Sequence, residues 1–217
     1  GVEGTFGLYT ATVGYKFAKR HAAFAGFRYA GGLKVKGFNM LGEPTKDYKP
    51  YDWTIDFGYA YMIGKGFSAY ATGNIIFSHL SKNANGGAFT VGASYQNNDM
   101  TVADKSANFM VDAKVAAIGP KLDYGNGYKV SMPTHVAVGG ALSVDMADKH
   151  QVGAAVSARY FFQPSETKVF MAGGGLEYTY NNMVSVRAGY EYGDHNLSHF
   201  TMGAGIKYRG LRLNGGY

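Results

Sequence analysis

Histidine is the residue type in this sequence that most readily suggests metal binding or acid–base catalysis. His195 and His199 are four residues apart, but they flank an expected loop and strand start, so they do not share a helix face. With no Cys in the chain, thiolate metal sites and Cys nucleophiles are excluded. No GxSxG elbow, HExxH helix or phosphate-binding loop leading into a helix occurs. The sequence predicts no metal, no cofactor and no enzymatic activity. The six histidines are His21, His79, His135, His150, His195 and His199.

A second group of candidates consists of charges that alternate with apolar residues along extended segments. Such charges, inside a barrel, either select solutes or pair with one another and close the lumen, and we expect pairing. Glycine runs at 173–175 and 203–205 lead into no helix, which favours strand curvature or close packing over a nucleotide loop. The charges are Asp52, Asp56, Asp112, Lys114, Arg159, Glu177, Arg187, Glu191 and Lys207.

These residues lie in segments with a period of two. "YDWTIDFGYAY" at 51–61 separates one file of large apolar side chains from a file of small and acidic ones. The apolar file is Tyr51, Trp53, Ile55, Phe57, Tyr59 and Tyr61, and the other file is Asp52, Thr54, Asp56, Gly58 and Ala60. We count twelve such segments and no amphipathic helix, so the sequence predicts an all-β protein. At 21–33, Phe24 and Arg28 share a parity, which predicts a bulge.

Short turns such as "AKRH" and "GKG" alternate with longer polar connections at 36–49, 80–86, 118–133, 162–167 and 193–198. The stretch "QNNDMTVADKSA" is an exception, because it is long where a short turn is expected. Strands of about ten residues with this alternation of connections indicate a transmembrane antiparallel β-barrel of the outer-membrane type. The file from Tyr51 to Tyr61 would then face outer-membrane lipid, with Asp52 and Asp56 in the lumen.

A soluble sandwich or lipocalin-like barrel is the alternative fold. Its strands average about five or six residues, and its solvated face would carry many Lys and Glu. The polar files here are mostly Gly, Ser, Thr and Ala, which favours the membrane barrel and a multi-pass location in a Gram-negative outer membrane. The net charge of +6 is spread in small groups, so no nucleic-acid partner is expected.

Three stretches together resemble the PorV/PorQ family of outer-membrane proteins of the type IX secretion system, whose barrels look like fatty-acid transporters. The first runs from "LYTATVGYKFAKRHAAFAGFRY" through "GEPTKDYKPYDWTIDFGYAY", and the second is "AAIGPKLDYGNGYKVSMPTHVAVGGAL". The third is "GGLEYTYNNMVSVRAGYEYGDHNLSHFTMGAGIKYRGLRLNGGY". The resemblance covers nearly the whole chain and implies a single barrel domain over residues 1–217. Because family barrels look fourteen-stranded, we expect the twelve segments to lack an N-terminal segment and a last strand.

The resemblance implies a subunit that binds a large secretion translocon barrel and receives secreted cargo through its C-terminal signal domain. It would then deliver this cargo to a cell-surface attachment complex. Long loops would make these contacts, with rings that Gly125 and Gly127 could lift away from the barrel rim. Two alternatives stay open: an outer-membrane channel for small hydrophobic solutes, and a PorQ-like structural subunit of another surface complex. The candidate partner-binding residues are Tyr48, Lys49, Pro120, Lys121, Asp123, Tyr124 and Tyr128.

Overall fold

The computed structural model describes residues 2–39, 41–80, 82–125, 127–166, 168–194, 197–209 and 211–216. Twelve strands form one sheet in the order β16-β15-β14-β13-β12-β11-β8-β7-β6-β5-β3-β2. They are β2 (Gly7–Phe17), β3 (His21–Gly31), β5 (Tyr51–Gly64), β6 (Phe67–His79), β7 (Asn83–Val102), β8 (Lys105–Ile118), β11 (His135–Ala147), β12 (His150–Phe161), β13 (Val169–Tyr180), β14 (Val184–Gly193), β15 (His199–Tyr208) and β16 (Leu211–Gly216). This confirms the all-β fold with twelve visible strands.

Two short antiparallel pairs lie outside this sheet: β1 (Val2–Glu3) with β4 (Lys34–Val35), and β9 (Leu122–Asp123) with β10 (Lys129–Val130). No helix in the described part of the chain is long and apolar enough to cross a membrane.

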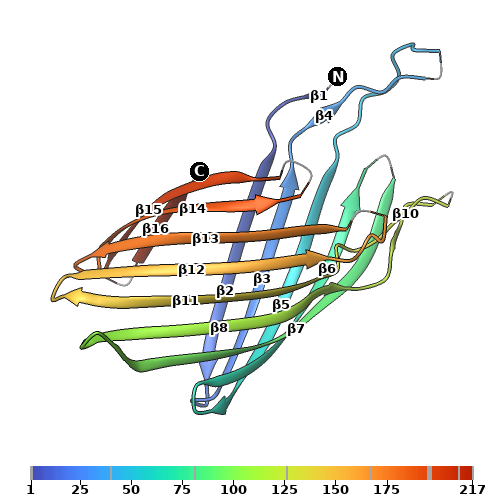
Figure 1. The fold of residues 1–217 in the computed structure, drawn as a ribbon. Helices are drawn as coiled ribbons and strands as arrows, with labels where there is room; N and C mark the ends of the chain where they lie inside the picture. The colour runs from blue at the N-terminus through green and yellow to red at the C-terminus, as the bar shows by residue number, and fades with distance from the viewer. Residues whose placement is uncertain are drawn as a thin grey trace. The chain divides into compact units, whose positions relative to one another are not determined.

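The chain folds into two compact units. Unit 1 comprises Gly1–Met62, Tyr70–Val91 and Ala116–Thr134, and unit 2 comprises Ile63–Ala69, Gly92–Val115 and His135–Tyr217. In unit 1, β2, β3 and β5 run side by side in unbroken antiparallel register (Figure 1). In unit 2, the strands from β11 to β15 pair in the same up-and-down manner, and β16 pairs with β15. Each unit is therefore built from consecutive hairpins.

Strand β5 shows how the alternating sequence becomes two unlike faces. Ile55, Phe57 and Tyr59 are 42–51% exposed, whereas Asp56, which points to the opposite side, is 8% exposed. We call the side that carries Phe57 the apolar face and the side that carries Asp56 the charged face. The same division holds in β12, where Val156 is 67% exposed on the apolar face and Arg159 lies on the charged face.

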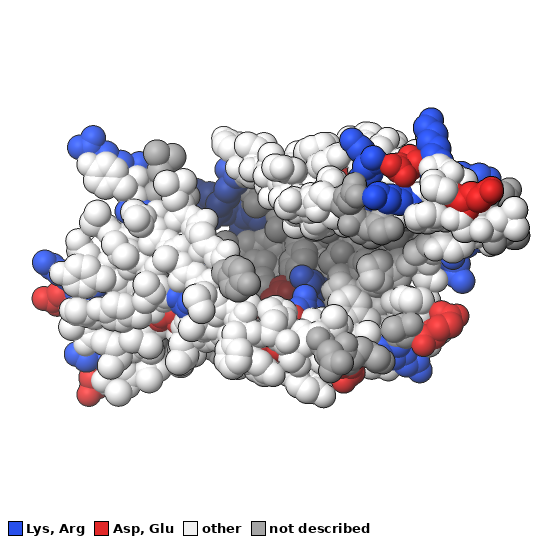
Figure 2. Space-filling model, turned by 90° about the horizontal axis from the view of Figure 1, so that it is seen from above, with Lys and Arg blue, Asp and Glu red and all other residues white. Residues whose placement is uncertain are grey.

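Buried apolar side chains are few among the described residues. They are Ala84, Ala107, Ala116, Leu122, Tyr124, Met132 and Ala137, and no large side chain is fully buried. Most of the visible surface belongs to uncharged residues (Figure 2). A soluble sandwich would bury its apolar files in a core, so these exposed files favour lipid as their solvent.

Aromatic rings edge the apolar face of unit 1 at both strand ends. Where long loops connect the strands, the rings of Tyr29 and Tyr51 stack at 6.3 Å between centroids, and Tyr51 stacks on His79 at 5.0 Å. At the short-turn end, His21 lies between Phe17 and Tyr61, at 5.5 and 5.0 Å. Two aromatic girdles of this kind are typical of outer-membrane barrels.

Two local expectations are wrong. Residues 96–107 form no long connection, because β7 continues to Val102 and a two-residue turn leads directly into β8. Polar residues occupy both faces of this stretch, so the period of two that marks a strand is lost. Strand β3 has no bulge, since its register with β2 and β5 is continuous. Phe24 lies on the charged face because Gly58, its partner on β5, leaves room for the ring.

Candidate functional site on the charged face

In unit 1, the charged face carries a closed polar cluster around Asp56. The Arg28 guanidinium donates from Nε to Oδ2 at 2.6 Å and from Nη2 to Oδ1 at 2.8 Å. Asn74 Nδ2 and Thr54 Oγ1 also donate to Oδ1, at 2.5 and 3.2 Å. The cluster joins β3, β5 and β6, and it satisfies the buried carboxylate without a ligand.

In unit 2, two further ion pairs lie on the charged face. Arg187 Nε is 3.4 Å from Glu177 Oε2, and Arg187 Nη2 donates to Asn214 Oδ1 at 2.8 Å. Arg159 pairs with Glu191 across the intervening strand β13. Together with the Asp56 cluster, these contacts confirm the expected pairing for five of the nine candidate charges: Asp56, Arg159, Glu177, Arg187 and Glu191.

The glycines of 203–205 provide the space for the Arg187 side chain. A Cβ at Gly203 would lie 3.2 Å from Arg187 Cγ, and one at Gly205 would lie 3.0 Å from Arg187 Nη2. Gly203 and Gly205 therefore allow a close approach between side chain and strand. This agrees with the structural role expected for the run.

A hollow of about 540 Å³ lies on the charged face of unit 2. Its floor consists of small residues from β11 to β14, including Ala141, Ala155, Gly173 and Gly175. Met110 contributes apolar surface. Polar groups border the floor: Gln96, Asn108, Ser143, Glu177, Arg187 and Glu191. The volume lies within the range of small-molecule sites, which are typically about 300–1,000 Å³ with few polar groups.

The loop between β8 and β11 folds against the sheet of unit 1. Its residues Leu122, Tyr124 and Met132 form a buried cluster with Ala84. Tyr124 Oη donates to Ser78 Oγ at 2.6 Å. Leu122 fits beside Gly86, where a Cβ would lie only 2.5 Å from Leu122 Cδ2. The loop is therefore packed against β6 and β7 instead of standing clear of them.

This packing corrects one expectation about the candidate partner-binding residues. The two tyrosine rings of the loop are not both displayed: Tyr124 is 8% exposed, whereas Tyr128 is 60% exposed. The apolar cluster and the Ser78 hydroxyl hold Tyr124 against the sheet, so it cannot anchor a partner in this conformation. Its ring contacts that of Tyr128 at 5.8 Å between centroids.

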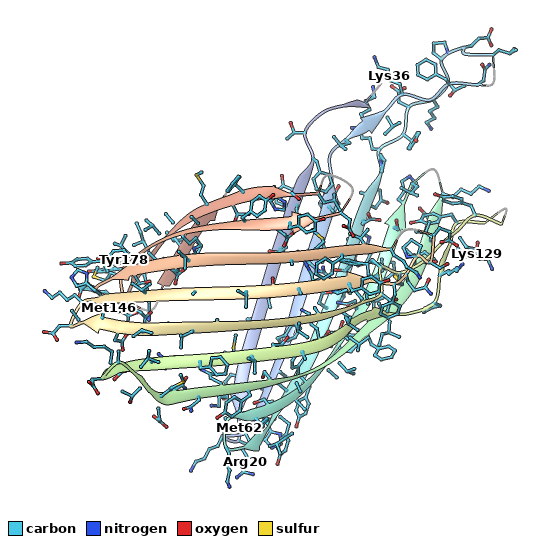
Figure 3. All side chains as sticks on the ribbon, viewed as in Figure 1. Arg20, Lys36, Met62, Lys129, Met146 and Tyr178 are labelled. Atoms are coloured by element: carbon cyan, nitrogen blue, oxygen red, sulfur yellow. The ribbon has the colours of Figure 1, made fainter. Side chains whose placement is uncertain are left out.

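The other candidate residues are on exposed loops. Pro120, Lys121, Tyr48 and Lys49 are all exposed. The backbone of Tyr48 is hydrogen-bonded to that of Val35. The backbone N–H of Gly125 and the Lys129 ammonium hold the pKa of Asp123 below its ordinary value. No hydrogen bond, ion pair or ring contact between described residues joins Tyr48 or Lys49 to the loop between β8 and β11. The structure therefore does not bring the candidate partner-binding residues together into one site. Figure 3 places Lys36 and Lys129, one from each loop, at the long-loop end of the unit 1 strands.

The predicted lipid-facing file lies on the apolar face of β5. Tyr51, Phe57 and Tyr61 are 37%, 51% and 37% exposed. Trp53 is half-buried because its ring stacks on Phe77 of β6 at 3.9 Å between centroids. Contact of this file with lipid stays a prediction. The other members of the file, Ile55 and Tyr59, are exposed as well.

Sequence reasoning missed Arg28 and Asn74 as members of the Asp56 cluster. The signal that could have identified Arg28 was its shared parity with Phe24. Phe24 is an apolar residue on the charged face, and once it is recognised as an exception to the alternation, Arg28 is placed on that face as well. Of the histidines considered for metal binding, His195 lies outside the described residues. Among the residues that the structure describes, no group of three or more His, Asp or Glu side chains could hold a metal ion.

Comparison with known proteins shows the fold. No family model and no curated protein sequence matches the chain. The toluene transporter TbuX of Ralstonia pickettii is similar in structure, with a TM-score of 0.57 at 14% identity over 94% of this chain and 74% of that one. The toluene transporter TodX of Pseudomonas putida gives a TM-score of 0.51 at 11% identity, over 97% and 80% of the two chains.

These likenesses, the antiparallel sheet and the exposed apolar files agree with one another. The chain has an antiparallel β-barrel fold of the outer-membrane type and is a multi-pass outer-membrane β-barrel.

Proposed function

We propose that this chain is the barrel of an outer-membrane channel for small hydrophobic solutes. The observation that carries the proposal is the hollow of about 540 Å³ on the charged face of unit 2. Its floor of glycine and alanine leaves apolar space for a compact solute, and the neighbouring charges are neutralised in ion pairs. Because these charges pair with one another, the hollow can hold an uncharged solute without leaving a charged group unpaired. Toluene, the solute named for TbuX and TodX, represents the class.

The test narrows the hollow from its floor. Ala155 lies between Ala141 and Gly175 in the register, so a Trp at this position can extend over its small neighbours. The matched control is Val156→Trp, because Val156 is the adjacent residue on the apolar face, where Trp would meet lipid. Since toluene crosses a plain phospholipid vesicle unaided, uptake of labelled toluene is measured in intact outer-membrane-bearing cells.

Ala155→Trp is expected to reduce barrel-dependent uptake at least several-fold, and Val156→Trp is expected to leave it unchanged. Both variants are first checked for a folded barrel by its heat-dependent mobility on a gel. Equal uptake by the Ala155→Trp barrel and the unmodified barrel would show that the hollow is not on the solute path.

A second candidate is the secretion role that the PorV/PorQ resemblance implies: binding the large translocon barrel and passing cargo to a surface attachment complex. The exposed Tyr128 ring and the exposed Lys121 on the same loop support it, because large rings on a polar loop are typical interface anchors. Co-purification separates the two functions. Recovery of a very large barrel or of secreted cargo with this chain, and its loss in Tyr128→Ala, would favour the secretion role.

A further inference from the structure

At the short-turn end of unit 1, four residues form a compact arrangement at the start of β3. His21 Nδ1 is hydrogen-bonded to Tyr59 Oη at 2.5 Å, and the His21 ring lies 5.0 Å from the ring of Tyr61. The preceding residue, Arg20, accepts a hydrogen bond at its carbonyl from the Met62 N–H at 2.8 Å. Figure 3 shows Arg20 and Met62 together at this end of the strands.

Unit 2 repeats the arrangement at the start of β12. His150 Nδ1 is hydrogen-bonded to Tyr178 Oη at 2.6 Å, and its ring lies 5.3 Å from that of Tyr180. The preceding Lys149 carbonyl accepts from the Asn181 N–H at 2.6 Å. In both units the histidine opposes the second tyrosine of a Tyr-x-Tyr sequence and bonds to the first.

The backbone by itself does not require these side chains. At the start of β14 the same main-chain contact occurs, because Lys207 N donates to the Met183 carbonyl at 2.6 Å. Val184 occupies the histidine position there, and Ile206 and Ala204 occupy the tyrosine positions. A hairpin of this shape therefore forms with plain apolar residues, so the cation, histidine and two tyrosines need another explanation.

We propose that each arrangement binds the phosphate group of a glycerophospholipid in the periplasmic-side leaflet. Short turns of outer-membrane barrels face the periplasm, and aromatic girdles mark the headgroup level. With the tyrosine hydroxyl donating to Nδ1, the imidazole proton sits on Nε2, to which no described residue is bonded. This N–H and the exposed cation one residue earlier supply two donors for a phosphate diester.

The acyl chains have a continuous apolar surface next to each headgroup site. In unit 1, Phe57 follows Tyr59 toward the middle of β5 and is 51% exposed. In unit 2, Leu176 follows Tyr178 in the same way and is 64% exposed. Phosphate and hydrocarbon are thus accommodated on one face in the order in which a phospholipid presents them.

The two sites differ in charge. Lys19 and Arg20 both precede His21, whereas Asp148 precedes Lys149, and His150 borders a polar hollow of about 590 Å³ that Asp145 and Asp148 also line. Carboxylates repel an anionic headgroup, so unit 1 is expected to hold phosphatidylglycerol more tightly than unit 2. Phosphate binding at these two sites does not depend on which solute the barrel conducts.

The experiment counts bound lipids by native mass spectrometry while the delipidated barrel is titrated with phosphatidylglycerol. The unmodified barrel is expected to retain two lipids. Arg20→Ala with His21→Ala should retain one, and adding Lys149→Ala with His150→Ala should remove both. The control, Met183→Ala with Val184→Ala, changes the equivalent positions of a hairpin without the arrangement and should retain two.

Three results would overturn the proposal. The first is that the four-residue variant still binds two lipids at unchanged affinity. The second is that diacylglycerol with the same chains binds as tightly as phosphatidylglycerol. The third is that glycerol phosphate displaces the lipid at equal concentration. If the alanine variants do not fold, Tyr59→Phe with Tyr178→Phe replaces them, since it keeps the rings and removes only the hydroxyls that orient the histidines. A several-fold rise in Kd supports the proposal, and an unchanged Kd refutes it.

Discussion

A cation on the apolar face of β12 should destabilise the barrel, whereas the same cation one residue later should not. Val156 lies at the middle of β12, and its partners in the register are Gly140 and Gly174. An arginine at this position would extend past these two glycines into hydrocarbon. Its cross-strand neighbours have no side chain that could accept a hydrogen bond from it. Ser157, the next residue, is exposed on the charged face and also has glycine partners, Gly139 and Gly173.

The magnitude follows from the depth in the membrane and from the neighbours. Arginine on the lipid side near the bilayer midplane costs about 2–4 kcal/mol, which lowers the folded-to-unfolded ratio about 30-fold to 700-fold. At Ser157 the added guanidinium stays on the charged face. It lies across β13 from Glu191, with only Gly173 between the two positions. The expected change for Ser157→Arg is therefore about 0–1 kcal/mol.

Both variants are measured by urea unfolding in lipid vesicles, with the folded fraction read from the heat-dependent mobility of the barrel on a gel. Val156→Arg should unfold at clearly lower urea than Ser157→Arg. Equal midpoints would refute the assignment of the two faces. This pair is a better comparison than Phe57→Arg with Gly58→Arg, because a Cβ at Gly58 would lie 2.1 Å from Phe24 Cε1 and would add a steric cost unrelated to lipid.

Three further predictions concern the charged face and the loop at 119–134. Asp56→Ala should destabilise the folded barrel by about 1–3 kcal/mol in urea unfolding, because the Arg28 and Asn74 donors lose their shared acceptor; an unchanged midpoint would mean that water replaces the carboxylate. Tyr124→Ala should expose the loop to protease while Tyr128→Ala should not, since only Tyr124 is buried, and equal cleavage of both would contradict the packing described above. Because the pKa of Asp123 is lowered in the folded state, its stabilising contacts are complete above the unfolded-state pKa of about 3.9 and are lost as the pH falls through the lower folded-state pKa. Protection of the loop from hydrogen exchange should therefore fall in that acidic window. Asp123→Asn should abolish this pH dependence.

The sequence by itself determined the fold class and the two faces of each strand, because a period of two is a local property. The odd-numbered residues from Tyr51 to Tyr61 must all point to one side of an extended strand, whichever strand it pairs with. The turns followed for the same reason: Ala18 and Lys19, both at positive φ, lie in the three-residue connection between β2 and β3, which the sequence between two apolar files already marks. The continuation of β7 through residues 96–102 escaped detection, since a strand with polar residues on both faces has no alternation to detect.

Only the tertiary structure decided which side chains meet. Arg28 and Asp56 are 28 residues apart, and their contact depends on the register between β3 and β5, which parity alone leaves free by any even number of residues. The burial of Tyr124 likewise depends on Ser78, which is 46 residues earlier in the chain, so the loop sequence alone suggested a displayed ring. The repeated contact of histidine with Tyr-x-Tyr arises in the same way, because His21 and His150 each reach a tyrosine hydroxyl only once the strand register brings the neighbouring strand alongside.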